Sequence, residues 1–149
     1  MNAGFVALMA LAGFLMAFQA PINAALRTNV GVFESALVSF AVGTVLLVAI
    51  VLAAGKGSLA GLRSAPPWQY LGGGIGVLFV VASLLSAPKI GVAGLLVAAL
   101  AGQLVGALAI DAFGWFSLER RPIDAWRVLG ILLLIAAVWL LNGKGGPKP

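Results

Sequence analysis

The chain has 149 residues, of which 62% are hydrophobic and only 9% are charged, with a formal net charge of +5. Soluble domains are about a quarter charged and leave much of their surface in water, so this composition excludes an ordinary soluble fold and indicates a protein surrounded by lipid. Cysteine and histidine are absent. We therefore predict no thiolate metal site, no cofactor and no catalytic residue, because the commonest general base and metal ligand is missing.

Long uncharged intervals predict transmembrane helices. A helix needs about 20 apolar residues to cross the hydrocarbon, and four intervals approach or exceed this length. The last interval is shorter, but Arg127 can extend its charged end to the interface, where Trp126 is also favoured. The predicted spans, in chain order, are residues 3–26, 33–54, 68–87, 92–112 and 127–141.

These spans predict an all-α, polytopic membrane protein with a bundle of about five transmembrane helices. They are longer than the roughly ten-residue strands of a membrane barrel and lack the alternation of such strands. Residues 1–149 form one predicted membrane domain, in which residues 142–149 are a flexible tail.

Polar side chains inside the spans are the candidate substrate ligands, because polar groups in hydrocarbon usually face a bundle interior or a water-filled cavity. Gln19 and Asn23 lie four residues apart on one face of the first span, and Pro21 between them frees a backbone carbonyl. We predict that the substrate site is lined by Gln19, Asn23, Ser83 and Gln103.

Charged residues near the span ends are candidates for coupling or gating. Glu34 and Lys89 are predicted in this role, with interfacial anchoring as the alternative, since side chains at helix ends can extend to the interface. Arg27 is interpreted as an interfacial anchor, and Asp111 as a cap or a partner of the loop that follows it.

Small residues recur at a spacing of four in three of the spans. Such residues share one helix face and allow the close approach of another helix. The stripe in the fourth span is a candidate dimer contact. The predicted packing residues are Ser39 and Gly43, Gly72 and Gly76, and Gly94, Ala98, Gly102 and Gly106.

The basic residues are nearly balanced between the two predicted sides of the membrane. The side of the N-terminus holds five, namely Lys56, Arg63, Arg120, Arg121 and Arg127, and the other side holds four, namely Arg27, Lys89, Lys144 and Lys148. The positive-inside rule predicts that the side with more basic residues faces the cytoplasm, and five against four is nearly no excess. If Arg27 and Lys89 face a cavity, the remaining charges place the N-terminus in the cytoplasm. We favour the alternative, in which the chain inserts both ways and pairs with an inverted copy, because transporters are often built from inverted repeats and an odd number of spans supplies only one half.

Several short motifs follow one another in an order that resembles a known family. They are Gln19-Ala-Pro-Ile-Asn23-Ala-Ala-Leu26, Ser39-Phe-Ala-Val-Gly43-Thr44, Gly73-Gly-Ile-Gly76, Pro88-Lys-Ile-Gly-Val-Ala93, Ala101-Gly-Gln-Leu104, Ile110-Asp-Ala-Phe-Gly114 and Arg127-Val-Leu-Gly130. Together they resemble the small five-helix YdcZ-type proteins of the drug/metabolite transporter superfamily, which are related to the small multidrug-resistance and EamA-type transporters. The resemblance implies a bacterial inner-membrane transporter that corresponds to half of a ten-helix relative, and antiparallel pairing as in the small multidrug-resistance proteins. Those relatives carry a glutamate in the middle of their first helix, where this chain has Gln19.

The predicted function is secondary transport of a small metabolite or drug-like molecule by an antiparallel dimer, or by a pair with a homologous inverted partner. The predicted partners are the lipid bilayer, the second chain and the substrate, and no nucleic acid. The alternative is a membrane interaction or assembly protein that does not transport, in which the buried amides only hold helices together. No nucleophile–base pair or metal cluster is visible, so an enzyme is not predicted.

Overall fold

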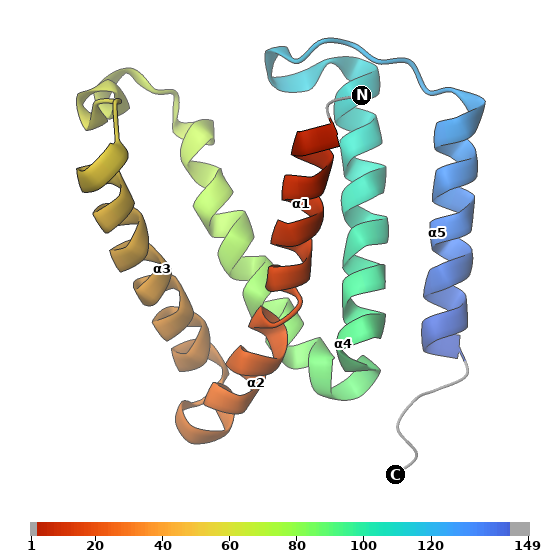
Figure 1. Cartoon of the computed structure of the whole chain (residues 1–149), viewed down its shortest axis with the longest axis horizontal. Helices are drawn as coiled ribbons and strands as arrows, with labels where there is room; N and C mark the ends of the chain where they lie inside the picture. Colours follow the sequence, from red (N-terminus) through yellow and green to blue (C-terminus); the bar gives the residue numbers. More distant parts are fainter. Residues whose placement is uncertain (1–2, 144–149) are drawn as a thin grey trace. The chain divides into compact units, whose positions relative to one another are not determined.

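A computed structural model describes residues 3–143, and no β-strand occurs within this range. The chain order is α1 (Ala3–Met16), α2 (Gln19–Val30), α3 (Val32–Ala54), η1 (Leu59–Ser64), η2 (Pro67–Tyr70), α4 (Leu71–Phe113), η3 (Trp115–Ser117) and α5 (Ala125–Gly143). Figure 1 labels the α-helices along the chain. The all-α, multi-span fold predicted from the uncharged intervals is thus confirmed.

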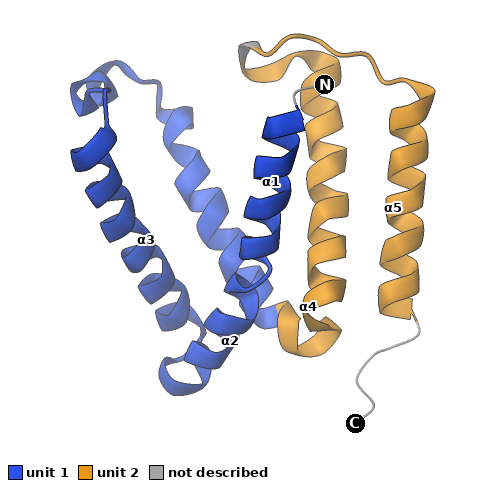
Figure 2. Ribbon diagram, in the orientation of Figure 1, with its two compact units in different colours: residues 1–85 blue, residues 86–149 orange. Residues whose placement is uncertain are grey.

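The chain divides into two compact units, residues 1–85 and 86–149, which are coloured separately in Figure 2. The first unit contains α1, α2, α3 and most of the first half of α4. The second unit contains the rest of α4 and all of α5.

The helix breaks lie at residues whose backbone chemistry favours them. Between α1 and α2 the chain turns at Ala17 and Phe18, and Pro21 occupies the first turn of α2, where a missing N–H is tolerated. Gly31 separates α2 from α3 with φ 103° and ψ 168°, a conformation that residues with a Cβ atom rarely adopt. The predicted span 3–26 therefore corresponds to two helices in succession.

A second glycine break lies inside the 43-residue helix α4, at Gly91 with φ 72° and ψ 167°. Because helical dihedrals are lost at this residue, the segments before and after it are separate helices, as the two predicted spans 68–87 and 92–112 require. The fifth helix continues through Asn142 and Gly143, which the sequence places in the predicted tail. Residues 144–149 of that predicted tail lie outside the described residues.

The core of the first unit is small. Ala36 of α3 packs with Val80 and Leu84 of α4, and these three residues are buried. The partly buried side chains around them are Val32, Phe40, Phe79 and Val81.

The second unit pairs the end of α4 with α5 in an antiparallel arrangement. Asn142 near the end of α5 donates to the carbonyl of Gly94 at 3.5 Å, and Arg127 in the first turn of α5 contacts Asp111 near the end of α4. These two contacts lie at opposite ends of the helix pair and set its register.

Most large apolar side chains point outward. In the most hydrophobic window of each helical segment long enough to span a membrane, at most 17% of the residues are buried. Such an exposed apolar surface is costly in water but matches a lipid environment. The tertiary structure therefore supports the membrane assignment made from composition.

Candidate functional site

A polar contact between α2 and α3 forms the best-buried polar cluster of the first unit. The Asn23 amide donates to Ser39 Oγ at 3.2 Å, and Ser35 Oγ donates to the Asn23 carbonyl at 2.8 Å. Asn23 is 6% exposed and Ser35 is fully buried. Since a buried polar group is costly unless it is hydrogen-bonded, these bonds hold α2 against α3.

Arg27 lies one helical turn after Asn23, on the same face of α2, and its guanidinium Nη1 donates to the Leu84 carbonyl of α4. The Leu84 carbonyl differs from other helical carbonyls because its usual donor is missing. In a regular helix the carbonyl of Leu84 accepts from the amide of residue 88, but residue 88 is proline, which has no N–H. Arg27 therefore satisfies the backbone acceptor that Pro88 leaves without its helical donor.

The sequence interpretation of Arg27 as an interfacial anchor missed this role. The available signal was Pro88, since a proline within an apolar span requires another donor for the carbonyl four residues earlier. The sequence does not show which donor serves, because Arg27 and Leu84 are 57 residues apart.

The four predicted substrate ligands have different surroundings. Gln19 is exposed and Asn23 is buried in the contact with Ser39. Ser83 is half-buried and donates to the Phe79 carbonyl of its own helix at 2.8 Å. Gln103 is exposed in the second half of α4 and has no hydrogen bond within residues 3–143. The first three belong to the first unit and Gln103 to the second, so no single unit contains all four.

The two predicted coupling residues are both exposed. Glu34 lies in the first turn of α3, and its carboxylate covers Gly31, where an added Cβ would collide with it. The negative charge is favourable there, because the start of a helix carries a partial positive charge. Lys89 lies between Pro88 and the break at Gly91 and makes no ion pair with a described residue.

The predicted packing residues fall into two groups. Some are in contact within their unit: Ser39 bonds Asn23, a Cβ at Gly76 would touch the Phe40 ring at 3.5 Å, and a Cβ at Gly94 would collide with Asn142. Others have open space around them among the described residues. At Gly43, Gly72, Gly102 and Gly106 a Cβ would find no atom within 4 Å, and Ala98 is exposed.

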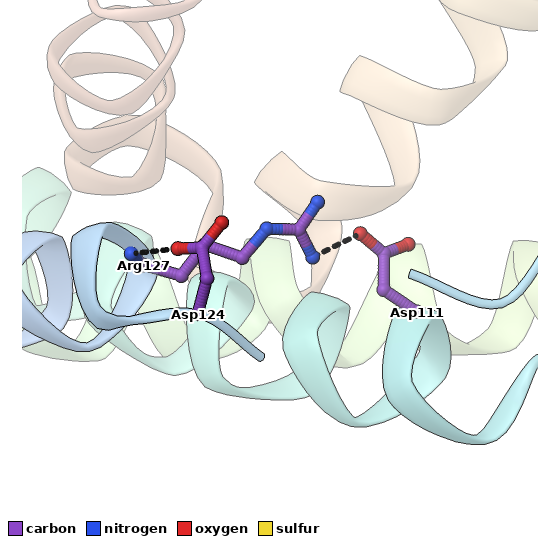
Figure 3. A network of polar contacts seen from close by, with 3 residues as sticks. All are labelled: Asp111, Asp124 and Arg127. Atoms are coloured by element: carbon purple, nitrogen blue, oxygen red, sulfur yellow. Dashed lines mark hydrogen bonds and ion pairs between the residues drawn. The ribbon is translucent and has the colours of Figure 1, made fainter. Parts of the chain in front are cut away.

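A charged pair closes one end of the second unit. Arg127 Nη1 lies 3.2 Å from Asp111 Oδ2, and the Arg127 amide donates to Asp124 Oδ1 at 2.8 Å, as Figure 3 shows. Asp124 precedes the first residue of α5, so it caps the helix that carries Arg127. Asp111 was expected to act as a cap or to pair with the loop that follows it; its side chain does form a pair, but the partner is Arg127 in the first turn of α5, beyond that loop.

Two comparisons with known proteins identify the family. Residues 4–140 match the family model DMT_YdcZ, described as "Putative inner membrane exporter, YdcZ". The chain belongs to this family. It is also 29% identical over 119 residues to the inner membrane protein YdcZ of Escherichia coli strain K12, an alignment that covers 77% of this chain and 78% of that protein. No solved structure matches the chain.

Membership of the YdcZ family confirms the resemblance read from the ordered motifs. The chain is a multi-pass inner-membrane protein of a transporter family, and this assignment places it among transporters rather than enzymes. The polar contacts of Asn23 and of Asp111 described above hold neighbouring helices together within their units.

Proposed function

We propose that this YdcZ-family chain is a secondary transporter of a small metabolite or drug-like molecule. Two copies in opposite orientations would supply ten helices and enclose a midplane site. Alternating access would arise as the two copies exchange environments across the membrane, as inverted repeats do in larger transporters.

The exposed amide of Gln103 carries this proposal. It lies near the middle of the helix that runs from Gly91 to Phe113, where no water is available in a bilayer. Transfer of an amide from water to cyclohexane, where it has no hydrogen-bond partner, costs about 4–8 kcal/mol. An unpartnered Gln103 side chain facing hydrocarbon is therefore strongly unfavourable. A cavity or a second chain beside Gln103 removes that cost.

The surroundings of Gln103 favour a second chain. Ala98, Gly102 and Gly106 are exposed, and the two glycines have open space beside them. A face of small residues allows the backbone of another helix to approach closely. We therefore place the dimer contact on this face, with Gln103 at its edge toward the substrate.

The other proposed ligands differ in how much of their hydrogen-bonding capacity is left for a substrate. The Gln19 side chain makes no hydrogen bond to a described residue, so its full capacity is open to a substrate. Asn23 uses one of its two amide hydrogens on Ser39 and keeps the other hydrogen and its side-chain oxygen, whereas Ser83 uses its single hydroxyl proton on the Phe79 carbonyl and can only accept. In this proposal Gln19 and Gln103 donate to the substrate, and Glu34 and Lys89 act in coupling or gating.

The substitution Gln103→Leu tests the proposal against the assembly-protein alternative. The control is Gln69→Leu, which removes an exposed amide from η2, at the start of the predicted span 68–87 rather than in the middle of a span. The measurements are the dimer fraction by cross-linking and the thermal shift of the purified protein across a panel of metabolites and drugs. Transport predicts an intact dimer that no longer binds a ligand of the unmodified protein, and a confirmed ligand is then followed by flux in vesicles. Loss of the dimer would instead show that the amide holds the chains together.

Inverted pairing has its own test. A reporter of sidedness fused to the C-terminus is expected to give signal in both compartments. Signal confined to one compartment would refute dual insertion of this chain and leave a homologous inverted partner as the source of the second half.

A further inference from the structure

The second unit contains a hollow that the proposed transport site does not use. It has a volume of about 300 Å³ and lies between the end of α4 and the start of α5. Its lining residues are Leu104, Ala107, Leu108 and Gly130, with Asp111 and Arg127 at its polar end. The volume is at the lower end of the range for small-molecule sites.

The hollow begins at the depth of the lipid headgroups. Asp111 lies two residues before the end of α4, and Arg127 is the third residue of α5. Trp126, which is 80% exposed, is adjacent to Arg127, and tryptophan at a span end is typical of the membrane interface. The charged pair therefore marks the interface, and the apolar lining marks the hydrocarbon.

The hollow extends along α4 into the hydrocarbon. Leu104 precedes Asp111 by seven residues, which corresponds to about 10 Å along a helix. A hollow with an apolar lining over this length and a polar end at the headgroup level can take the upper part of one acyl chain.

The charges at the polar end define the headgroup. Arg127 Nη1 and Asp111 Oδ2 contact each other, while the remaining guanidinium nitrogens and Asp111 Oδ1 have no partner among residues 3–143. The side chains are 28% and 36% exposed, respectively, so both are accessible. A purely anionic headgroup would be repelled by Asp111 and a purely cationic one by Arg127, whereas a headgroup with both charges complements the pair.

We propose that this hollow binds a phosphatidylethanolamine-type phospholipid. The lipid phosphate accepts from Arg127, the primary ammonium donates to Asp111, and one acyl chain lies against Leu104, Leu108 and Gly130. A choline headgroup fits less well, because its quaternary ammonium has no N–H to donate. The site is separate from the proposed substrate site and does not depend on transport.

Delipidated full-length protein in detergent provides the test, with bound phospholipid counted by native mass spectrometry. Phosphatidylethanolamine, phosphatidylcholine and phosphatidylglycerol with the same acyl chains are compared. We expect the first to bind at least about fivefold more tightly than the other two, since hydrogen bonds to charged groups are among the stronger ones. Equal binding of the three lipids would overturn the proposal.

Two variants separate the acyl site from the headgroup site. Gly130→Leu fills the hollow, and its Cβ has no atom within 4 Å, so the fold accommodates it. It should lower phosphatidylethanolamine binding at least about fivefold, because the added Leu side chain occupies apolar space in which the lipid acyl chain would be buried. The control Gly13→Leu, on α1 and equally open, should leave binding unchanged. Asp111→Asn should reverse the preference toward phosphatidylglycerol, because Arg127 is then unpaired.

Two further results would contradict the assignment. Unchanged lipid binding by Gly130→Leu, together with an altered dimer fraction, would show that a second copy of the chain occupies the hollow. Displacement of the lipid by water-soluble phosphoethanolamine at equal concentration would show that the acyl chain makes no contribution.

Discussion

The bond from Arg27 to the Leu84 carbonyl makes a prediction that links two distant substitutions. Arg27→Met keeps much of the apolar stem but removes the donor, so the carbonyl that Pro88 leaves without a helical partner is orphaned. Leu84 is only 1% exposed, which leaves little access for water. We expect Arg27→Met to lower the free energy of unfolding.

The size of the effect follows from two limits. A hydrogen bond to a charged group contributes about 1.5–3 kcal/mol in soluble proteins. Side-chain hydrogen bonds measured by double-mutant cycles in a membrane protein average about 0.6 kcal/mol, because the unfolded chain in the membrane also finds partners. We therefore expect a loss of about 1 kcal/mol, between these values.

Pro88→Ala should remove this dependence. Alanine restores the N–H at residue 88, which can donate to Leu84 in the helical pattern. Arg27→Met is then expected to cost less in the Pro88→Ala background than in the otherwise unmodified protein, with a coupling energy of about 1 kcal/mol.

The assay is reversible unfolding in mixed micelles, followed by circular dichroism, with all four members of the cycle compared. Arg63→Met is the matched control, because Arg63 is exposed in η1 and makes no hydrogen bond or ion pair with a described residue. The same cost of Arg27→Met in both backgrounds would refute the reasoning, since Pro88 would then have no connection to Arg27.

Two further predictions concern single positions. Gly94→Ala should force the Asn142 side chain away from the Gly94 carbonyl and cost about 1 kcal/mol of unfolding free energy in the same assay. This cost should disappear in an Asn142→Ala background, and the control Gly13→Ala, at an open position, should show no loss. An equal cost with and without the Asn142 amide would contradict the contact. Glu34→Gln should abolish the pH dependence of substrate flux in reconstituted vesicles if this carboxylate couples protons, whereas the exposed loop variant Glu119→Gln should retain it; flux by Glu34→Gln with unchanged pH dependence would remove Glu34 from the coupling mechanism.

The sequence by itself determined the environment and the class of fold. Uncharged intervals such as residues 33–54 are a local property, and in hydrocarbon such a segment must satisfy its own backbone polar groups, so it forms a helix. The family also followed from local motifs in order, because each motif reports the residues allowed at one turn or one helix face.

The positions of the helix breaks could be predicted from the sequence only in part. Gly91 lies in the short interval between the predicted spans 68–87 and 92–112, and its positive φ explains why glycine is needed there. The break between α1 and α2 was not predicted, although Pro21 was recognised as a helix irregularity. Apolar composition continues through Ala17 and Phe18, so hydropathy carries no signal for that turn.

Only the tertiary structure decided which polar groups are partnered. Asn23 carries a side-chain amide, as expected of a substrate ligand, yet this amide is hydrogen-bonded to Ser39. Gln103 carries the same functional group and has no partner among the described residues. The pairing of Arg27 with Leu84 likewise depends on the rotation and register of two helices far apart in the chain. Local pattern sets which residues form each helix, but the face that each helix turns toward its neighbour is set by packing, because outward-facing apolar side chains are equally compatible with lipid in any rotation.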